Sequence, residues 1–188
     1  MRTNISPLYL TKSKTRTDLL TLFFLNPETS YYLRELERRF GYSPGLLSRE
    51  LKMLTGEDIL ERDARTREVF YKINKMHPLF HEIKGIVEKT AGVPKRLSDG
   101  LKKIKEIKQA YLYGSAANGK MVTRSDIDLL LVGKETELFR KLLKRLETRF
   151  GRTINATTYS EEEFAKKRRN KSEVLYEVMK SSLVQLKP

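Results

Sequence analysis

The 188-residue chain contains no cysteine and only two histidines, His77 and His81. Without cysteine, disulfides and thiolate metal sites are excluded. The histidines have the four-residue spacing of metal ligands on a helix, but only carboxylates could complete such a site, so packing or capping roles are expected. Long apolar runs are also missing. Residues 19–25, interrupted at Thr21, reach about a third of the ~20 residues that a membrane span needs.

The residues before this run, 10–14, do not resemble a signal peptide with a cleavage site, so we expect a cytoplasmic protein without membrane contact. Acidic residues are few relative to basic ones: the net charge is +14, with +4 in residues 1–90 and +10 in residues 91–188. Such a field attracts nucleic acid or nucleotide phosphates. A surface that only confers solubility, as in many thermophile proteins, explains the charge equally well.

The N-terminal half has the pattern of three short helices followed by a hairpin. Helical periodicity predicts helices at 17–25 and 44–55, with a second helix between them that follows Ser30 and ends at Gly41. Alternation predicts strands at 59–62 and 67–73. The connecting turn, residues 63–66, carries arginine. The residues expected to cap or end the helices are Asn26, Pro27, Ser30, Gly41, Ser43 and Pro44.

The third predicted helix has an apolar face, with Leu47, Leu51 and Leu54, and a polar face opposite. This order of elements resembles the winged helix-turn-helix of ArsR-type regulators over residues 15–76. The resemblance implies a transcription regulator that binds double-stranded DNA, with the third helix in the major groove and the wing along the backbone. The alternative is a winged helix used for dimerisation or protein contact. The residues expected to contact DNA are Ser43, Ser48, Arg49, Lys52, Arg65 and Arg67.

An amphipathic stretch begins at His77-Pro78 and predicts a connecting helix, which could lie in the interface of a homodimer. Residues 90–94 indicate a linker, and 101–107 a basic amphipathic helix. A short strand, 110–113, then leads into Gly114-Ser115. After ten residues, Asp126-Ile127-Asp128 opens an apolar strand. Residues i and i+2 of a strand share a face, so the two carboxylates point together and favour a bound cation.

The Gly-Ser turn at this distance from Asp-x-Asp resembles the signature of minimal nucleotidyltransferases, relatives of the polymerase β catalytic domain, over residues 95–165. The resemblance implies that Gly114 and Ser115 bind a nucleoside triphosphate, with ATP expected. It also makes Asp126 and Asp128 the catalytic ligands of Mg²⁺ or Mn²⁺. Glycine lets the backbone approach phosphate closely. The alternative is a Gly-Ser turn followed by solvated aspartates. Two further cations expected near the phosphates are Lys120 and Arg124.

The chain departs from that family at two positions. Many relatives have arginine where Asn118 stands, and the family's third carboxylate matches Asn155, a predicted metal ligand. Asparagine can coordinate through its carbonyl oxygen but brings no charge and cannot act as a base. A helix is predicted at 135–150. Further along the chain, the basic run at 166–169 either contacts nucleic acid or forms a solvated helix face.

The predicted fold class is therefore α+β in two domains: a winged helix-turn-helix at 1–76 and a nucleotidyltransferase-fold α/β domain with a mixed sheet at 95–188, joined by 77–94. Two functions fit these domains. One is a Mg²⁺-dependent enzyme that transfers NMP to a protein or small-molecule acceptor, resembling antitoxins that modify a partner toxin. The other is a transcription regulator whose degenerate nucleotidyltransferase domain senses nucleotide.

Overall fold

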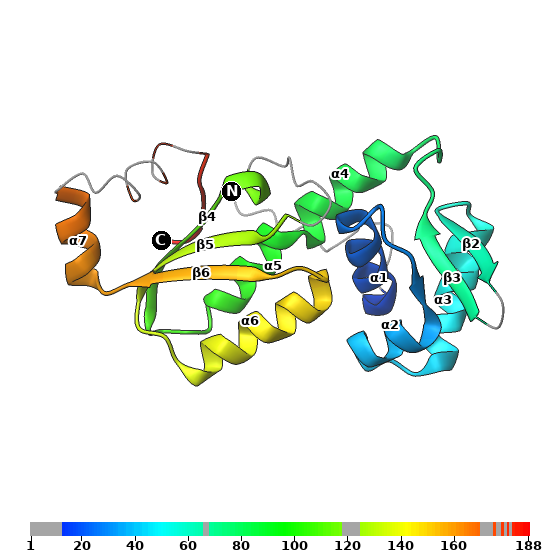
Figure 1. Cartoon of the computed structure of the whole chain (residues 1–188), viewed down its shortest axis with the longest axis horizontal. Coiled ribbons are helices and arrows are strands. Elements are labelled where there is room, and N and C mark those ends of the chain that lie inside the picture. The colour runs from blue at the N-terminus through cyan, green and yellow to red at the C-terminus, as the bar shows by residue number, and fades with distance from the viewer. Residues whose placement is uncertain are drawn as a thin grey trace. The chain divides into compact units, whose positions relative to one another are not determined.

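The computed structural model describes residues 13–65, 68–117, 125–169, 175, 178, 180 and 182–188. They form two compact units: Met1–Gly92 with Thr148–Phe150, and Val93–Glu147 with Gly151–Pro188 (Figure 1). None of the helices in the described part of the chain has the length and apolar content that crossing a bilayer requires.

The first unit confirms the three predicted helices and the hairpin. The helices contribute one face each to a shared core, and a short strand before the second helix completes a three-stranded antiparallel sheet of order β1-β3-β2. Its elements are α1 (Lys14–Leu25), β1 (Tyr31–Tyr32), α2 (Leu33–Phe40), α3 (Pro44–Gly56), β2 (Leu60–Arg65) and β3 (Glu68–Ile73).

The predicted helix ends at Gly41 and Ser43 are confirmed. Gly41 ends α2 in the left-handed conformation, with φ +68°, and the Ser43 hydroxyl accepts a hydrogen bond from the Leu46 amide at 3.4 Å at the start of α3. The prediction of Ser30 as the cap of α2 is wrong. Tyr31 and its neighbour are extended and pair with β3, so α2 begins at Leu33. The buried Tyr31 ring packs edge-on against Phe23, and this tertiary contact outweighs the local capping preference.

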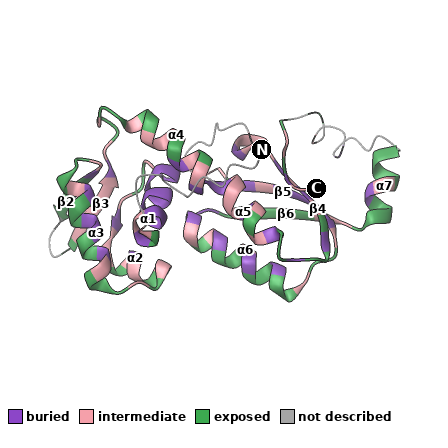
Figure 2. Cartoon of the chain, turned by 180° about the vertical axis from the view of Figure 1, so that it is seen from behind, coloured by how far each residue is buried: buried purple, intermediate pink, exposed green. Residues whose placement is uncertain are grey.

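The core of the first unit is built around α1, which is buried on nearly all sides, whereas the outer face of α3 is exposed (Figure 2). Leu19, Leu22 and Phe23 are fully buried. Asp18 is buried as well and accepts a hydrogen bond of 2.6 Å from the Tyr42 hydroxyl. Burial, together with this bond to a carboxylate, raises the pKa of Tyr42 to about 12.

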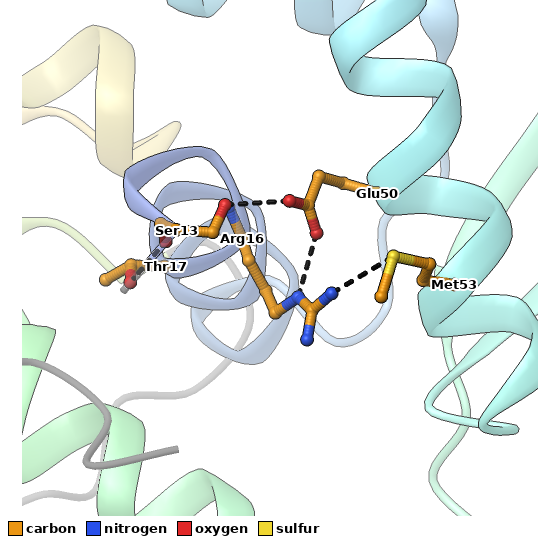
Figure 3. Close-up of polar contacts among 5 residues, drawn as sticks. All are labelled: Ser13, Arg16, Thr17, Glu50 and Met53. Carbon is orange, nitrogen blue, oxygen red and sulfur yellow. Dashed lines mark hydrogen bonds and ion pairs between the residues drawn. The ribbon is translucent and has the colours of Figure 1, made fainter. Parts of the chain in front are cut away.

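A polar cluster attaches α3 to the N-terminus of α1 (Figure 3). Glu50 of α3 is buried and accepts hydrogen bonds from the Ser13 hydroxyl at 2.7 Å and Arg16 Nε at 2.8 Å. Arg16 Nη2 also lies 3.3 Å from Met53 Sδ. Burial by itself raises the pKa of Glu50, but the bonds from Arg16 and Ser13 outweigh it and the pKa lies below its usual value. The cluster therefore holds an ionised carboxylate that sets the orientation of α3.

The predicted connecting helix is confirmed as α4 (Phe80–Ala91), whose Phe80, Ile83 and Val87 side chains join the core of the first unit. The linker predicted at 90–94 and the helix predicted at 101–107 are wrong. A helix, α5 (Val93–Leu101), occupies the first position, and residues 102–106 form turns. Pro94 is tolerated because it stands in the first turn, where the missing N–H has no partner within the helix.

The second unit contains the mixed sheet expected from the sequence, with strand order β6-β5-β4-β7. β5 and β6 are parallel, and the other pairs are antiparallel. The edge strand β7 was not predicted. The elements are β4 (Ile107–Tyr113), β5 (Ile127–Gly133), α6 (Glu137–Phe150), β6 (Ile154–Tyr159), α7 (Glu161–Arg169) and β7 (Val184–Lys187).

The two faces of this sheet are covered differently. Helices α5 and α6 lie on one face of the sheet (Figure 1). Ile127, Leu129 and Leu131, the alternate residues of β5, are buried. On the other face, Leu130 and Val132 form a cluster with Phe164 of α7. Asp128 lies on that same face, near the start of β5, and precedes the apolar residues of the cluster. The polar beginning of β5 therefore lies outside this apolar cluster.

Candidate active site

Three polar side chains meet where β5 and β6 begin. The sheet register pairs Asp128 with Asn155 of β6 on one side and with Tyr113 of β4 on the other. The Asn155 amide nitrogen lies 3.2 Å from Asp126 Oδ2 and 3.5 Å from Asp128 Oδ1. The two carboxylates thus share a face, as the sequence predicts, and Asn155 lies beside them.

The Gly114 turn lies directly against Asp128 of this pair. Gly114 has φ +71° and opens a single 3₁₀ turn, η1 (Gly114–Ala116), at the end of β4. A Cβ atom at this position would lie only 2.9 Å from Asp128 Oδ2. A left-handed φ strains any residue that has a Cβ, and the Cβ would also crowd the Asp128 carboxylate, so both features favour glycine here. The turn, with Ser115 half-buried in it, is therefore held next to the carboxylates.

Arg152, which the sequence did not indicate, holds Ser125, the residue that precedes Asp126. Its buried guanidinium Nη1 donates to the carbonyl oxygen of Ser125 at 2.7 Å and lies 3.4 Å from the Ser125 hydroxyl. The Ile127 amide donates to the Thr153 carbonyl at 2.9 Å. These bonds hold the start of β5, and with it Asp126. A lone arginine after the glycine that ends α6 has no periodicity, so no local signal distinguishes it from a solvated side chain.

Tyr113 is a second neighbour that the sequence did not indicate. Burial is the main cause that raises its pKa, and the charge of Asp128 adds to it, while a hydrogen bond with Thr157 acts in the opposite direction. The phenol is thus a neutral neighbour of Asp128 and adds no negative charge to the site.

The donor set fits a hard divalent cation. Two carboxylates and an amide oxygen are ligands that Mg²⁺ and Mn²⁺ accept. The described residues contain no group of three or more His, Cys, Asp or Glu side chains suited to a metal. Asp126 and Asp128 therefore supply two negative charges and no third, and Asn155 is the remaining candidate ligand.

The other predicted phosphate contacts, Lys120 and Arg124, lie outside the described residues, as does Asn118. A cavity of about 530 Å³, lined by Lys108, Phe164 and Arg168 among others, opens at the opposite end of the sheet. It is separate from the carboxylate pair. The basic run 166–169 forms the exposed last turn of α7.

The predicted DNA contacts divide between described and undescribed residues. Ser43, Ser48, Arg49 and Lys52 are exposed at the start and on the outer face of α3. Within the described part of the chain, neither cation of α3 has an ion pair. The side chain of Arg65 and all of Arg67 lie outside the described residues.

Residues 95–182 match the family described as polymerase beta, nucleotidyltransferase. No curated protein matches the sequence. Among solved structures, a mutant of the toxin-antitoxin MntA-HpeT is 18% identical, with a TM-score of 0.36, and the match covers 50% of this chain and 72% of that one. A toxin-antitoxin structure with AMP-PNP is 21% identical, with a TM-score of 0.35 and coverages of 50% and 71%. A putative nucleotidyltransferase from Sulfolobus solfataricus is 24% identical, with a TM-score of 0.24 and coverages of 39% and 68%.

Proposed function

We propose that the second unit is a Mg²⁺-dependent nucleotidyltransferase that transfers NMP from a nucleoside triphosphate, with ATP expected, to a protein or small-molecule acceptor. The observation that carries the proposal is the convergence of the Gly114 turn with Asp126 and Asp128. The family match over residues 95–182 supports it independently. The sequence resemblance to antitoxins that modify a partner toxin makes such a toxin one candidate acceptor.

The chemistry follows from the residues where β5 and β6 begin. Asp126 and Asp128, with Asn155, would hold the cation, which when bound neutralises charge on the triphosphate oxygens. Backbone N–H groups of the Gly114 turn and the Ser115 hydroxyl would bind phosphate. An acceptor hydroxyl forms a bond to the α-phosphorus, the bond to the pyrophosphate breaks, and the hydroxyl proton passes to solvent, because the Asn155 amide cannot accept it.

Asn155 favours a second candidate function, in which the domain binds nucleotide without turnover and acts as a sensor. General-base help is typically worth 10²–10⁴-fold, and this site has no third carboxylate to supply it. The two candidates share the nucleotide site and differ only in the chemical step.

For the first unit we propose that α3 and the β2–β3 hairpin form a winged helix-turn-helix that binds duplex DNA, so that the protein joins a DNA-binding unit to a nucleotide-binding one. The exposed Ser48, Arg49 and Lys52 side chains on α3 support this proposal, since a helix with a basic outer face can enter the major groove.

The nucleotide site is tested by the thermal stability of the whole protein. Mg·ATP at a hundred times its Kd should stabilise the wild type by about 2.7 kcal/mol. A double variant, Asp126→Asn with Asp128→Asn, should keep its fold, because the change removes charge repulsion, but should lose this effect. Equal stabilisation of wild type and double variant would refute the metal assignment. Incubation with α-labelled ATP, Mg²⁺ or Mn²⁺ and host lysate then separates enzyme from sensor.

A further inference from the structure

The orientation of the Asn155 amide is dictated by its neighbours. Ionised Asp126 and Asp128 are hydrogen-bond acceptors only, so the amide oxygen would be repelled and the NH₂ group must face them. An NH₂ group has two N–H bonds, one for each carboxylate, and its nitrogen lies 3.2 and 3.5 Å from their oxygens. The amide thus stands where a shared cation would neutralise the pair.

We propose that Asn155 closes the carboxylate pair in the nucleotide-free protein, so that a divalent cation enters this site only together with the nucleoside triphosphate. The inference rests on the proposed nucleotide site and specifies how that site is loaded. In the nucleotide-free protein, Asn155 is then a positioning residue that competes with the free metal ion, and its proposed role as a ligand belongs to the nucleotide-bound state.

The energetic argument compares the two ways of loading the site. A free Mg²⁺ ion must displace the amide from both carboxylates and lose bound water, which Mg²⁺ gives up reluctantly. It gains only two charged ligands in return. A Mg·triphosphate complex meets the same obstacle but adds phosphate contacts at the Gly114 turn, which offset the displacement. Because Asn155 is exposed, packing does not prevent its amide from rotating when the complex arrives.

Removal of the amide separates this proposal from the simpler view that Asn155 ligates metal through its oxygen. If the amide competes with free metal, Asn155→Ala binds Mn²⁺ more tightly than the wild type. If the amide oxygen is a metal ligand in the absence of nucleotide, Asn155→Ala binds Mn²⁺ more weakly than the wild type. Thr158→Ala is the matched control, since Thr158 lies on the same strand but its hydroxyl donates to Glu135 instead, at 2.9 Å.

The experiment is a Mn²⁺ titration of the full chain without nucleotide, followed by electron paramagnetic resonance of the unbound ion. We expect Asn155→Ala to lower the Kd for Mn²⁺ about threefold and Asn155→Asp at least about tenfold, which is about 1.4 kcal/mol, while Thr158→Ala leaves it unchanged. In a ¹⁵N-labelled sample, the Asn155 side-chain NH₂ signals, identified by their loss in Asn155→Ala, should shift with Mg·ATP and not with Mg²⁺ alone.

Equal or weaker Mn²⁺ binding by Asn155→Ala, or an NH₂ shift with Mg²⁺ alone, overturns the inference. In that case Mg·ATP would still stabilise the wild type and fail to stabilise the Asp126→Asn, Asp128→Asn variant, which leaves the proposed function intact. If Mg·ATP stabilises neither protein, the proposed function fails and the inference fails with it. Melting curves of all variants without ligand verify that each is folded.

Discussion

At the scale of single residues, the candidate site depends on the lack of a side chain at Gly114 and on the uncharged side chain of Asn155. Gly114 allows the turn after β4 to approach Asp128 Oδ2, which a Cβ atom would meet at 2.9 Å. Asn155 gives the carboxylate pair a neutral donor in place of a third negative charge. Under the proposed function, the first feature favours nucleotide binding and the second limits the chemical step that can follow.

Gly114→Ala should abolish the stabilisation by Mg·ATP. The added Cβ meets the Asp128 carboxylate and also forces a left-handed backbone on alanine, which costs roughly 1–2 kcal/mol. Gly41→Ala is the control, because Gly41 has nearly the same φ, +68°, but nothing within 4 Å of its Cβ. It should lower the melting temperature and leave nucleotide binding unaltered. Wild-type nucleotide binding by Gly114→Ala would contradict the placement of the phosphates at this turn.

Asn155→Asp should raise transfer of label from α-labelled ATP at least about tenfold, provided an acceptor is present. The change is nearly isosteric and restores a third charged ligand and a base, and such a base typically contributes 10²–10⁴-fold. The measurement is label incorporated per minute in matched reactions. Rapid transfer by the wild type, unaffected by this substitution, would show that the chemistry runs on Asp126 and Asp128 alone.

At the scale of secondary-structure elements, the orientation of α3 depends on a charge cluster as well as on leucines. Its apolar face packs in the core through Leu47, Leu51 and Leu54, as the periodicity predicts. Glu50 lies beside that face and bonds to Ser13 and Arg16 at the start of α1 (Figure 3). Leucines alone permit a helix to rotate or slide, whereas a buried carboxylate with two donors specifies one arrangement.

Glu50→Gln should lower the free energy of unfolding by roughly 1.5–3 kcal/mol at neutral pH, the range for hydrogen bonds to charged groups. The pKa of Glu50 is lower in the folded protein than its usual value of 4.5. The stabilisation is therefore complete above about pH 4.5 and is lost as the pH falls through the lower folded value. Urea melts from pH 7 to pH 3 should show the difference between variant and wild type shrinking only in the acidic range.

The control for this prediction is Glu57→Gln, which removes an exposed carboxylate just after α3. It should change stability by less than about 0.5 kcal/mol, as expected for a surface position. A difference between Glu50→Gln and wild type that persists unchanged at pH 3 would show that shape, and not the charge of Glu50, stabilises α3.

At the scale of the whole molecule, the proposed DNA affinity has two possible sources: the exposed cations of α3, or the electrostatic field of the net charge of +14. Alanine at both Arg49 and Lys52 should weaken binding of the full chain to duplex DNA at least about tenfold, about 1.4 kcal/mol. It should also reduce the slope of log affinity against log salt concentration by about 2, because two phosphate contacts are lost. Fluorescence anisotropy over a range of salt concentrations measures both.

A control with the same loss of charge is available in the second unit. Lys95 and Lys102 both pair with Asp99, at 3.0 and 3.6 Å. Alanine at these two lysines should leave the DNA affinity within about threefold of wild type. If both double variants weaken binding equally, the net field of the protein, and not the face of α3, is responsible.

The sequence by itself determined the features that depend on neighbouring residues. The left-handed Gly41, the Ser43 cap with Pro44 after it, and the alternation in β3 and β5 follow from local backbone preferences and from which face each side chain must bury. The separation of Gly114-Ser115 from Asp126 and Asp128 likewise indicated the site, because the first motif follows one strand and the second opens the next.

Only the tertiary structure decided the features whose partners are distant in the chain. Tyr31 and Tyr32 form a strand because β3 is there to pair with them, and β7 forms against β4 for the same reason. Arg152 supports the start of β5 from 27 residues away. The sequence identified Asn155 as a missing charge, but only the register of β6 on β5 places its NH₂ group against both carboxylates. Hydrogen bonds between distant segments leave no periodicity, so they cannot be read before the chain is folded.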